Sequence, residues 1–513
     1  MISLKRILLQ CLLLYHVTAF TQVQGFFNIY EQTEKSLCAS ASIEIDDESL
    51  IVAAYDYYGG AGTLLKISKE GTIIKSVSLG DDIVYSGVEG LYRAPSNPGL
   101  FYGIGHVIHQ DSQITKPFVL RFDDDLDLIE IKEVDLPGDY HSFVMSRSLL
   151  TNDGDFLYAT SLNGQNSFHR LYMRIALDGE LLSFYEESEE CGSAIQIDAI
   201  FEFPEGNRFG DFRNSFVSPV NHSQKMRLFG FDDEFVFDTI HEYERIYQTI
   251  DDTIYSFILM SVANGTVVPF NDTTLLFSDR ISEMWQQPNV GTIYGQDRST
   301  VLFSADLEGN MENYLVVGSG NDTVDCPVAF NAVDMAKDGS PDNYIYHGCY
   351  GFNSLSSPNH ITLTKTDENL NVIWQKSYTH PLRFLQANCL QATKDGGCLI
   401  VGGAYDYINE HYDLFLLKVN SDGNVGIDEI VVTDKVAAFP NPGINILKLT
   451  TASKKGFVEV FDMNGRQACC QQITEDVTTI KTDTWPAGIY IWKVVSDNSS
   501  SLTVTETGKW IKK

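Results

Sequence analysis

Two short segments place tyrosine rings beside a carboxylate. They are Tyr55-Asp56-Tyr57-Tyr58 and Tyr405-Asp406-Tyr407, and each follows an apolar run that contains Leu-Ile-Val. Aromatic rings can stack on the face of a sugar, and carboxylates accept hydrogen bonds from its hydroxyl groups. The alternative is that these residues only cap strands of a degenerate repeat. On the first interpretation, we predict a ligand-binding cluster made of Tyr55, Asp56, Tyr57, Tyr405, Asp406 and Tyr407.

Metal ligands are harder to find. No two histidines have a recognised ligand spacing, although several lie in segments expected to be loops, at His106, His109, His141, His222, His360, His380 and His411. The acidic turns at 306–310 and 420–424 do not fit a twelve-residue calcium loop, and their glycines stand where a hairpin turn needs positive φ. We predict no cofactor, with calcium as the alternative.

Motifs of the common hydrolases and nucleotide-binding enzymes are missing from the sequence. It contains no Gly-x-Ser-x-Gly, no His-Glu-x-x-His and no glycine-rich phosphate loop that leads into a helix. A glycosidase, however, needs only two carboxylates that meet in space, and such a pair leaves no local pattern. We therefore predict no catalytic residue, and the sequence leaves open whether the protein is an enzyme.

The elements that would position these residues form a repeat. An apolar strand, a polar turn and a second apolar strand recur seven times, and the residue after the turn acids serves as an anchor in each copy. The anchors are Gly71, Leu126, Gly179, Phe235, Gly309, Leu370 and Gly423. Their spacing of 53 to 74 residues, with alternating strands and no amphipathic helix, is typical of a β-propeller. The longest step predicts an insertion between Thr253 and Asp297.

A second strand precedes each anchored pair and is entered from a polar turn, for example at Pro98-Gly99, Asp153-Gly154 and Asp395-Gly396. With four strands in each blade, the tight turns then lie on one rim and the longer connections on the other. Loops on a rigid scaffold can vary without cost to the core, so we expect the second rim to bind ligands. Closure of the ring would make the Tyr55 and Tyr405 segments neighbours.

The C-terminal 78 residues have a different character. They contain Phe439-Pro440-Asn441-Pro442, the segment GFVEVFDMNGR from Gly456 to Arg466, Trp485-Pro486-Ala487-Gly488-Ile489-Tyr490, and the basic end Gly508 to Lys513. In this order the four landmarks closely resemble the C-terminal sorting domain of the type IX secretion system. The resemblance implies a Bacteroidetes-type protein that the secretion machinery carries across the outer membrane. It assigns the sorting motif to Pro440, Asn441, Pro442, Gly465, Gly488, Tyr490, Lys509 and Lys512.

The N-terminus is consistent with export. Lys5 and Arg6 precede an apolar run from Ile7 to Tyr15, which is followed by small residues near positions 19 and 25. The run is far shorter than the about 20 apolar residues that a membrane span requires. We predict a removable signal peptide and no transmembrane segment.

Charge and cysteine usage describe the surroundings of the body. The net charge is −33, and residues 26–435 hold 25 Lys and Arg against 62 Asp and Glu. Such a body repels nucleic acid and anionic membranes, so neither is an expected partner. Six of the nine cysteines lie in the body, where one or two disulfides or buried thiols are both compatible with an exported chain.

Together these patterns predict an all-β protein, a seven-bladed β-propeller followed by a small C-terminal β-sandwich. The expected domains are a signal peptide at 1–25, the propeller at 26–434 and the sorting domain at 435–513. We expect a secreted or cell-surface protein whose partners are the type IX machinery and a glycan or surface protein. The alternatives are a secreted polysaccharide hydrolase or lyase, and a structural component of surface adhesion.

Overall fold

The computed structural model is built from strands throughout the part of the chain that it describes. That part is residues 25–512, apart from 32–34, 47, 81–82, 110–111, 142, 164–167, 190–196, 207, 219–222, 245, 251–252, 260–264, 287–292, 319–323, 337–343, 353–358, 381, 426–431, 434–437, 440–442, 451–455, 463–465, 475–476 and 499–500. The predicted signal peptide, and the Pro440–Pro442 and Gly465 positions of the sorting motif, therefore lie outside the described residues.

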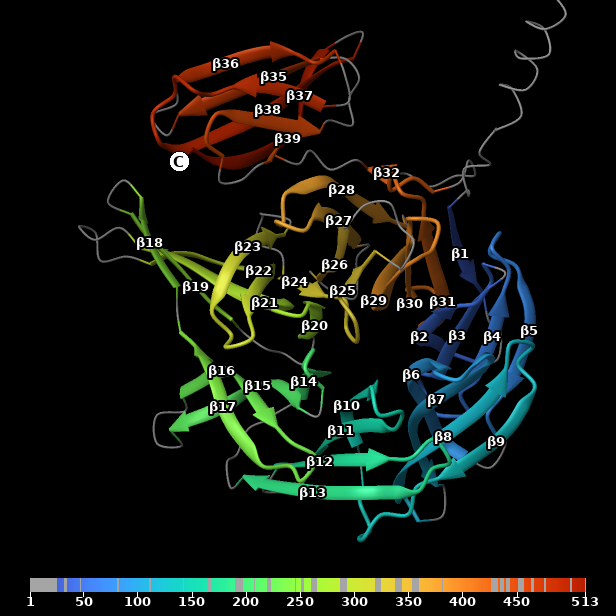
Figure 1. Cartoon of the computed structure of the whole chain (residues 1–513). Coiled ribbons are helices and arrows are strands. Elements are labelled where there is room, and N and C mark those ends of the chain that lie inside the picture. Colours follow the sequence, from blue (N-terminus) through green and yellow to red (C-terminus); the bar gives the residue numbers. More distant parts are fainter. Residues whose placement is uncertain are drawn as a thin grey trace, which may run out of the picture.

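Seven blades surround a common axis, which confirms the predicted all-β propeller (Figure 1). Each of the first four blades is an antiparallel sheet whose four strands pair in sequence order. The strands are β2–β5 (Leu37–Glu44, Leu50–Asp56, Thr63–Ile67, Ile73–Ser78), β6–β9 (Ile83–Ala94, Asn97–His109, Thr115–Asp123, Leu128–Glu133), β10–β13 (Phe143–Leu150, Phe156–Asn163, Phe168–Ile175, Leu181–Glu189) and β14–β17 (Ile197–Glu202, Phe209–Ser218, Ser223–Phe231, Phe237–Tyr243).

Blades 5 and 6 carry additions to this plan. Their main strands are β20–β23 (Thr266–Asn271, Thr274–Gln286, Ile293–Asp306, Met311–Val317) and β25–β28 (Val333–Met335, Tyr344–Phe352, His360–Asp367, Val372–Thr379). An extra hairpin, β18 (Ile246–Ile250) and β19 (Thr253–Leu259), pairs with the far end of β21 and accounts for the long repeat step. Strand β24 (Val324–Pro327) pairs with β22 and β26 and joins the two blades into one sheet, and β32 (Val432–Thr433) pairs with β28.

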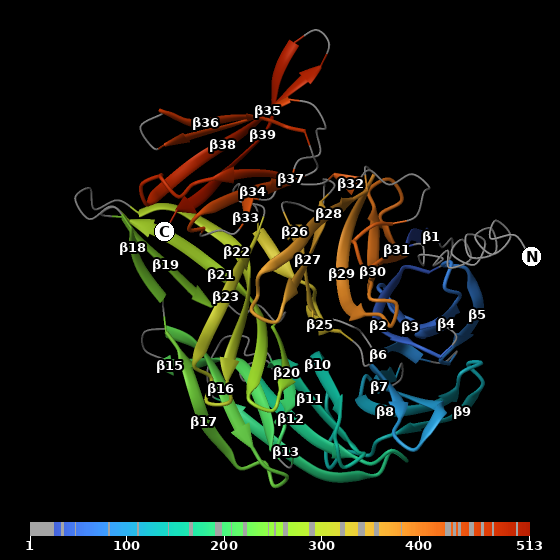
Figure 2. The same ribbon diagram turned by 45° about the horizontal axis from the view of Figure 1, so that its top comes forward.

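Blade 7 is completed by the N-terminal end of the described chain. Its first three strands are β29 (Arg383–Ala392), β30 (Cys398–Asp406) and β31 (His411–Val419), and its fourth strand is β1 (Phe26–Tyr30). Strand β1 runs antiparallel to β31, from Phe26 opposite Lys418 to Tyr30 opposite Leu414. Residues from the two ends of the repeat body therefore share one sheet, which closes the ring (Figures 1 and 2).

The apolar core is divided among the joints between blades. Ile51 of blade 1 packs with Phe118 of blade 2, and Leu50 of blade 1 packs with Leu416 of blade 7. Each strand contributes side chains to two joints because successive residues point to opposite faces of a sheet. Continuous apolar runs such as Leu-Ile-Val are the result, since both faces of an inner strand are buried.

The repeat anchors occupy one backbone conformation. All seven have positive φ, from 57° at Phe235 to 83° at Gly71, and in each the anchor N–H donates to the carbonyl three residues earlier. Three anchors are not glycine, and the side chains of Leu126, Phe235 and Leu370 are buried in the joints. Burial of these side chains offsets the strain of positive φ, which explains why the repeat tolerates them. One predicted turn was misplaced, because Pro98 and Gly99 lie inside β7 and the turn is at 95–96.

The C-terminal residues form two small sheets outside the ring (Figure 2). One has β33 (Ala438–Phe439), β34 (Ile446–Thr450) and β37 (Val477–Lys481), and the other has β36 (Gln467–Gln472), β35 (Gly456–Asp462), β38 (Gly488–Asn498) and β39 (Ser501–Lys512). Leu447 and Ile480 of the first sheet share a core with Val458 and Trp492 of the second, so the predicted β-sandwich is confirmed. The predicted boundary at 434/435 falls among residues that are not described.

The sorting residues that are described lie on the last two strands. Gly488 opens β38 opposite Lys512, and the Tyr490 ring lies 4.8 Å from that of Trp485 while its hydroxyl donates to the Pro486 carbonyl. Lys512 is buried and Lys509 is exposed. The landmark residues Trp485, Gly488 and Tyr490 thus form part of this sandwich.

Two further findings concern the environment of the chain. The seven described cysteines form no disulfide, and the five of them in the propeller are buried thiols. Of the two interpretations of the body cysteines, these five therefore follow the buried one. In the same part of the chain, no helix has the length and hydrophobicity needed to span a bilayer.

Candidate ligand-binding sites at the ring closure and the ring centre

Ring closure brings the two tyrosine-rich segments together. Both follow the second strand of a blade, β3 in blade 1 and β30 in blade 7. Ser36, which precedes β2, links them, because its carbonyl accepts from the Tyr57 N–H at 2.6 Å and its hydroxyl accepts from the Tyr412 N–H at 2.8 Å. The predicted proximity of the two segments is therefore found in the structure.

Five tyrosines, which we call the tyrosine cluster, meet at this joint: Tyr57, Tyr58, Tyr405, Tyr407 and Tyr412. The ring centroid of Tyr412 lies 4.5 Å from that of Tyr57 and 5.0 Å from that of Tyr405. Tyr412 is buried, whereas Tyr57 and Tyr58 expose 47% and 65% of their surface. The Tyr58 hydroxyl donates to the Glu410 carbonyl at 2.6 Å, so even the outermost ring is tied to the neighbouring blade. The cluster offers a supported aromatic surface to solvent.

Two predicted residues and one unpredicted residue have other roles. Tyr55 interacts with the buried Cys38 thiol and is not one of the exposed rings. Tyr412 was not predicted, although it pairs directly with Tyr405 across the β30–β31 hairpin. The second tyrosine of a Tyr-x6-Tyr hairpin was the available signal, because residues opposite each other in antiparallel strands bring their side chains together.

The two predicted carboxylates are engaged in their own loops. One oxygen of Asp56 accepts from the N–H groups of Ser36 and Tyr58. Asp406 accepts from Ile408 N–H at 2.7 Å and pairs with the Arg383 guanidinium. Burial alone would raise the pKa of Asp406, but the Ile408 N–H, Arg383 and Asn409 outweigh it and hold that pKa well below its usual value. The geometry thus supports a loop-capping role for both acids and leaves the rings as the accessible chemistry.

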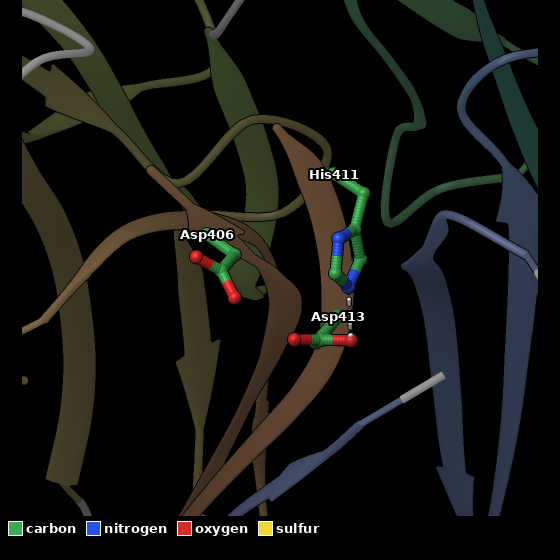
Figure 3. Close-up of side chains that lie close together, drawn as sticks. All are labelled: Asp406, His411 and Asp413. Atoms are coloured by element: carbon green, nitrogen blue, oxygen red, sulfur yellow. Dashed lines mark hydrogen bonds and ion pairs between the residues drawn. The ribbon is translucent and has the colours of Figure 1, made fainter. Parts of the chain in front are cut away.

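A charged group lies beneath the tyrosine cluster. Asp406, His411 and Asp413 place one ligand atom each within 4.8 Å of one another (Figure 3). The His411 imidazole is 3.0 Å from the buried carboxylate of Asp413, and Arg383 pairs with both aspartates. Imidazole and carboxylate donors suit a divalent metal, but Arg383 already supplies a positive charge between the acids.

The predicted calcium turns use their acids differently. Oδ1 of Asp306 accepts from the Asn310 N–H at 2.8 Å, and Oδ1 of Asn420 accepts from the N–H groups of Asp422 and Asn424. Side chains that cap their own turn are typical of hairpin loops. The described histidines are also dispersed over separate blades: His106 lies on β7, His360 on β27 and His411 on β31.

A second candidate site lies at the ring centre. A cavity of about 680 Å³, which we call the central cavity, is lined by the first strands of the blades, with Ser42, Glu89, Arg147, Phe201 and Phe270 among its residues. It reaches the first-to-second turns at Asn152, Pro204 and Asp272. Local sequence patterns could not predict it, because its walls come from blades that only closure of the ring brings together.

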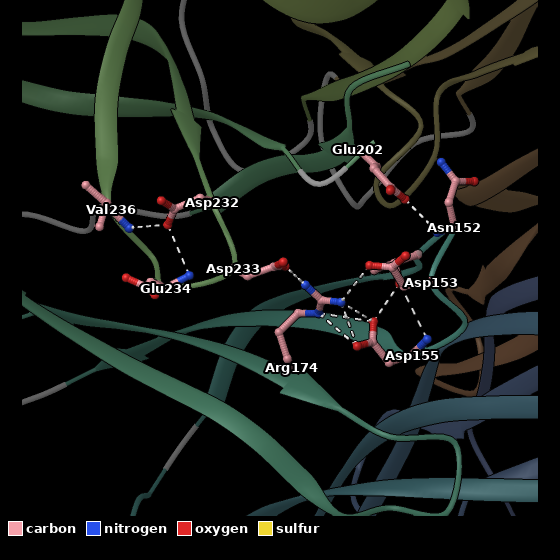
Figure 4. A network of polar contacts seen from close by, with 10 residues as sticks. Asn152, Asp153, Asp155, Arg174, Glu202, Asp232, Asp233, Glu234 and Val236 are labelled. Carbon is pink, nitrogen blue, oxygen red and sulfur yellow. Dashed lines mark hydrogen bonds and ion pairs between the residues drawn. The ribbon is translucent and has the colours of Figure 1, made fainter. Parts of the chain in front are cut away.

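A polar network borders the mouth of the central cavity (Figure 4). Arg174 of β12 pairs with Asp155 of its own blade at 2.6 Å and with Asp233 in the turn of blade 4. Nearby, Glu202 accepts from the Asn152 N–H at 2.7 Å, and burial followed by the charge of Asp153 raises its pKa above the usual value. Carboxylates thus outnumber cations in this network.

Arg174 belongs to a pattern that the sequence contains but that we did not predict. Five of the seven blades have a basic residue five positions before the turn anchor, namely Lys66, Arg121, Arg174, Lys365 and Lys418. Lys66 pairs with Asp125 in the turn of blade 2 at 3.0 Å, and Lys365 donates to the Ser421 carbonyl in the turn of blade 7 at 3.2 Å. At these joints, a cation on the third strand of one blade holds the turn of the next.

The fold and its C-terminal module define a class of exported propeller. Residues 437–507 match the family model of the secretion system C-terminal sorting domain. The protein is therefore secreted by the type IX system, with a propeller as its body.

Comparison with solved structures finds propellers at low identity. An α-L-arabinofuranosidase of Fusarium graminearum in complex with arabinobiose is 12% identical with a TM-score of 0.37, over 78% of this chain and 98% of that chain. The polysaccharide lyase Uly1 is 9% identical with a TM-score of 0.42, over 78% and 98%. An apocarotenoid oxygenase mutant from Synechocystis is 12% identical with a TM-score of 0.40, over 80% and 92%. No curated protein matches the chain.

Proposed function

We propose that the protein is a secreted or cell-surface binding protein whose propeller holds a glycan on the tyrosine cluster. The observation that carries the proposal is the exposure of Tyr57 and Tyr58 on top of the buried Tyr412 ring. Large exposed aromatics that are supported from behind are characteristic of binding surfaces, because they offer contact area at a low cost in conformational entropy.

A glycan suits this surface better than a strongly charged partner. The acids beside the rings are occupied by backbone N–H groups and by Arg383, so they offer no unpaired charge for a cationic peptide. The remaining groups are ring faces and phenolic hydroxyls, which match the apolar faces and the hydroxyls of a sugar.

The test is a glycan array probed with the purified protein, with release of reducing ends assayed in parallel on the same sugars. We expect binding without release, and at least tenfold weaker binding by a variant with Tyr57→Ala and Tyr58→Ala. Tyr314→Ala is the matched control, because Tyr314 is 40% exposed on β23 of blade 5. Equal binding by the double variant would contradict the assigned surface, and release of reducing ends would favour a hydrolase or lyase.

We propose the following route for the chain: removal of a signal peptide at 1–25, folding of the propeller at 26–434, and outer-membrane passage directed by 435–513. Support comes from the family match and from the C-terminal strand, where the buried Lys512 faces Gly488 and the Gly443 N–H donates to the Ile511 carbonyl. Deletion of residues 509–513 should leave a folded body in the periplasm, which fractionation and limited proteolysis would show. Normal export of that truncation, with exposed Lys509→Ala as control, would contradict the route.

A further inference from the structure

The central cavity is separate from the tyrosine cluster. Its lining reaches the first-to-second turns at Asn152, Pro204 and Asp272, whereas the cluster follows the second strands of blades 1 and 7. In a four-stranded meander these two kinds of connection lie on opposite rims. The volume of about 680 Å³ falls in the range of about 300–1,000 Å³ that is usual for small-molecule sites.

Bulges on the inner strands shape the wall of the central cavity. The register shifts in β2 at Ser40, in β6 at Glu89 and in β29 at Asn388. The Ser40 hydroxyl donates to the Val88 carbonyl at 2.5 Å, and the Asn388 amide donates to the Ala39 carbonyl at 2.7 Å, so the bulges also connect neighbouring blades. Bulges that recur at one level of a sheet commonly redirect a side chain toward a site. Here they place the Glu89 carboxylate in the wall.

The charged groups deep in the central cavity are compensated by the protein itself. The Glu89 side chain is only 9% exposed and accepts from His106 Nδ1 at 2.5 Å and from the Tyr158 hydroxyl at 3.4 Å. Arg147 lies over the Phe330 ring and donates to the carbonyls of Ser146 and Ala329. A carboxylate has about four acceptor positions, so Glu89 can still accept from a ligand hydroxyl.

The remaining lining disfavours anions and favours rings with hydroxyl groups. Glu202 and Asp272 stand at the mouth, so an anionic ligand would meet like charge there. Phe201, Phe270 and Tyr92 supply aromatic wall between the polar groups. Apolar faces that alternate with hydrogen-bonding groups match the two kinds of surface that a sugar ring presents.

We propose that the central cavity binds a neutral polyhydroxylated ligand of the size of a mono- or disaccharide. In this arrangement Glu89 and Glu202 accept hydrogen bonds from ligand hydroxyls, and the aromatic wall covers the apolar faces. The site is independent of the glycan surface proposed for the tyrosine cluster, and neither depends on the other being occupied.

Titration calorimetry of the full chain tests the proposal with a panel of neutral mono- and disaccharides, together with their amino-sugar and uronic-acid counterparts. We expect at least one neutral sugar to bind, and its charged counterparts to bind at least tenfold more weakly. Ser42→Trp should fill the cavity from β2 and abolish binding, whereas Ser76→Trp on the outer strand β5 should not. The double variant at Tyr57 and Tyr58 should bind the neutral sugar normally.

Three outcomes would overturn the proposal: no heat with any neutral sugar, preference for a charged sugar, or full binding by folded Ser42→Trp protein. If Ser42→Trp does not fold, Glu202→Gln takes its place, because it keeps the acceptor for the Asn152 N–H and removes only the charge and one acceptor oxygen. We expect several-fold weaker binding by Glu202→Gln, and unchanged affinity would count against the site. A silent glycan array with a positive calorimetric result would reject the surface site and retain the cavity.

Discussion

Two joints of the propeller are closed in different ways. At the joint of blades 7 and 1, backbone pairing of β1 with β31 closes the ring, and the Ser36 hydrogen bonds tie the loops together. At the joint of blades 3 and 4, buried side chains do this work. Arg213 donates to the Tyr172 hydroxyl at 2.7 Å and to Glu187 at 2.6 Å, while Tyr172 donates to Asp211 at 2.6 Å.

The difference shows where a propeller can place a binding surface. Buried charges must keep all their partners, so the side chains of the joint between blades 3 and 4 are committed to the fold. The rings of Phe229 and Phe237 that cover the Arg213 guanidinium are committed in the same way. Where the backbone closes the joint instead, side chains such as Tyr57 and Tyr58 remain at the surface.

Removal of β1 should have the largest effect on this comparison. A chain that lacks residues 26–30 leaves β31 as an open edge and also loses the Asn28 and Tyr30 hydrogen bonds to the Gly71 carbonyl in blade 1. We expect scanning calorimetry to show loss of the single cooperative transition. The Asn28→Ala variant is the control and should shift the transition only slightly. A sharp transition at the normal temperature in the deleted chain would show that side chains close this joint too.

Removal of one buried charge should have the next largest effect. Arg213→Met leaves Asp211 and Glu187 buried with fewer partners, and breaking such a network costs about 3–5 kcal/mol. Arg227→Met, which breaks a half-buried pair with Glu242 on the same sheet, should cost about 0–1 kcal/mol. Urea unfolding measures both free energies. Equal losses in the two variants would contradict the contrast between the joints.

Acid should affect the two joints unequally. The pKa of Asp406 is lowered in the folded protein, so its contribution to stability is present above the unfolded value of about 3.9 and is lost as the pH falls below it. At the other joint the pKa of Glu187 is lowered but that of Asp211 is raised, so their contributions change in opposite directions as the pH falls. We expect Asp406→Asn to reduce the pH dependence of the free energy of unfolding between about pH 5 and 3. An unchanged slope would show that Asp406 is not held by its loop.

The turns provide a smaller test of how the blades are connected. Gly154 has φ of 84° and open space where a Cβ would lie, whereas Gly423 has φ of 74° and a Cβ there would lie 2.9 Å from the Trp374 ring. Gly154→Ala should therefore cost about 1–2 kcal/mol from positive φ alone. Gly423→Val should cost more, because it adds a clash at the joint of blades 6 and 7. A smaller loss for Gly423→Val, measured by thermal unfolding, would contradict this order.

These contrasts also show which features could be predicted from the sequence. The anchors Gly71 to Gly423 were recognisable because each turn needs positive φ and a polar cap, which are local requirements that recur in every blade. The proximity of Tyr57 and Tyr405 followed from ring closure alone. The roles of Asp56 and Asp406 did not, because their partners are backbone N–H groups that no residue pattern records. The central cavity was equally hidden, since Glu89 reaches it through a bulge.

The smallest effect should come from the tyrosine cluster itself. If backbone pairing closes the joint of blades 7 and 1, replacing both Tyr57 and Tyr58 with alanine should change the free energy of unfolding by no more than about 0.5 kcal/mol per residue, as at ordinary surface sites. Tyr412→Phe is the sharper comparison, because it keeps the buried ring that supports Tyr57 and removes only the hydroxyl. A loss of several kcal/mol in the double variant would mean that the rings hold the joint together. Their exposure would then be a by-product of ring closure and no longer an argument for binding.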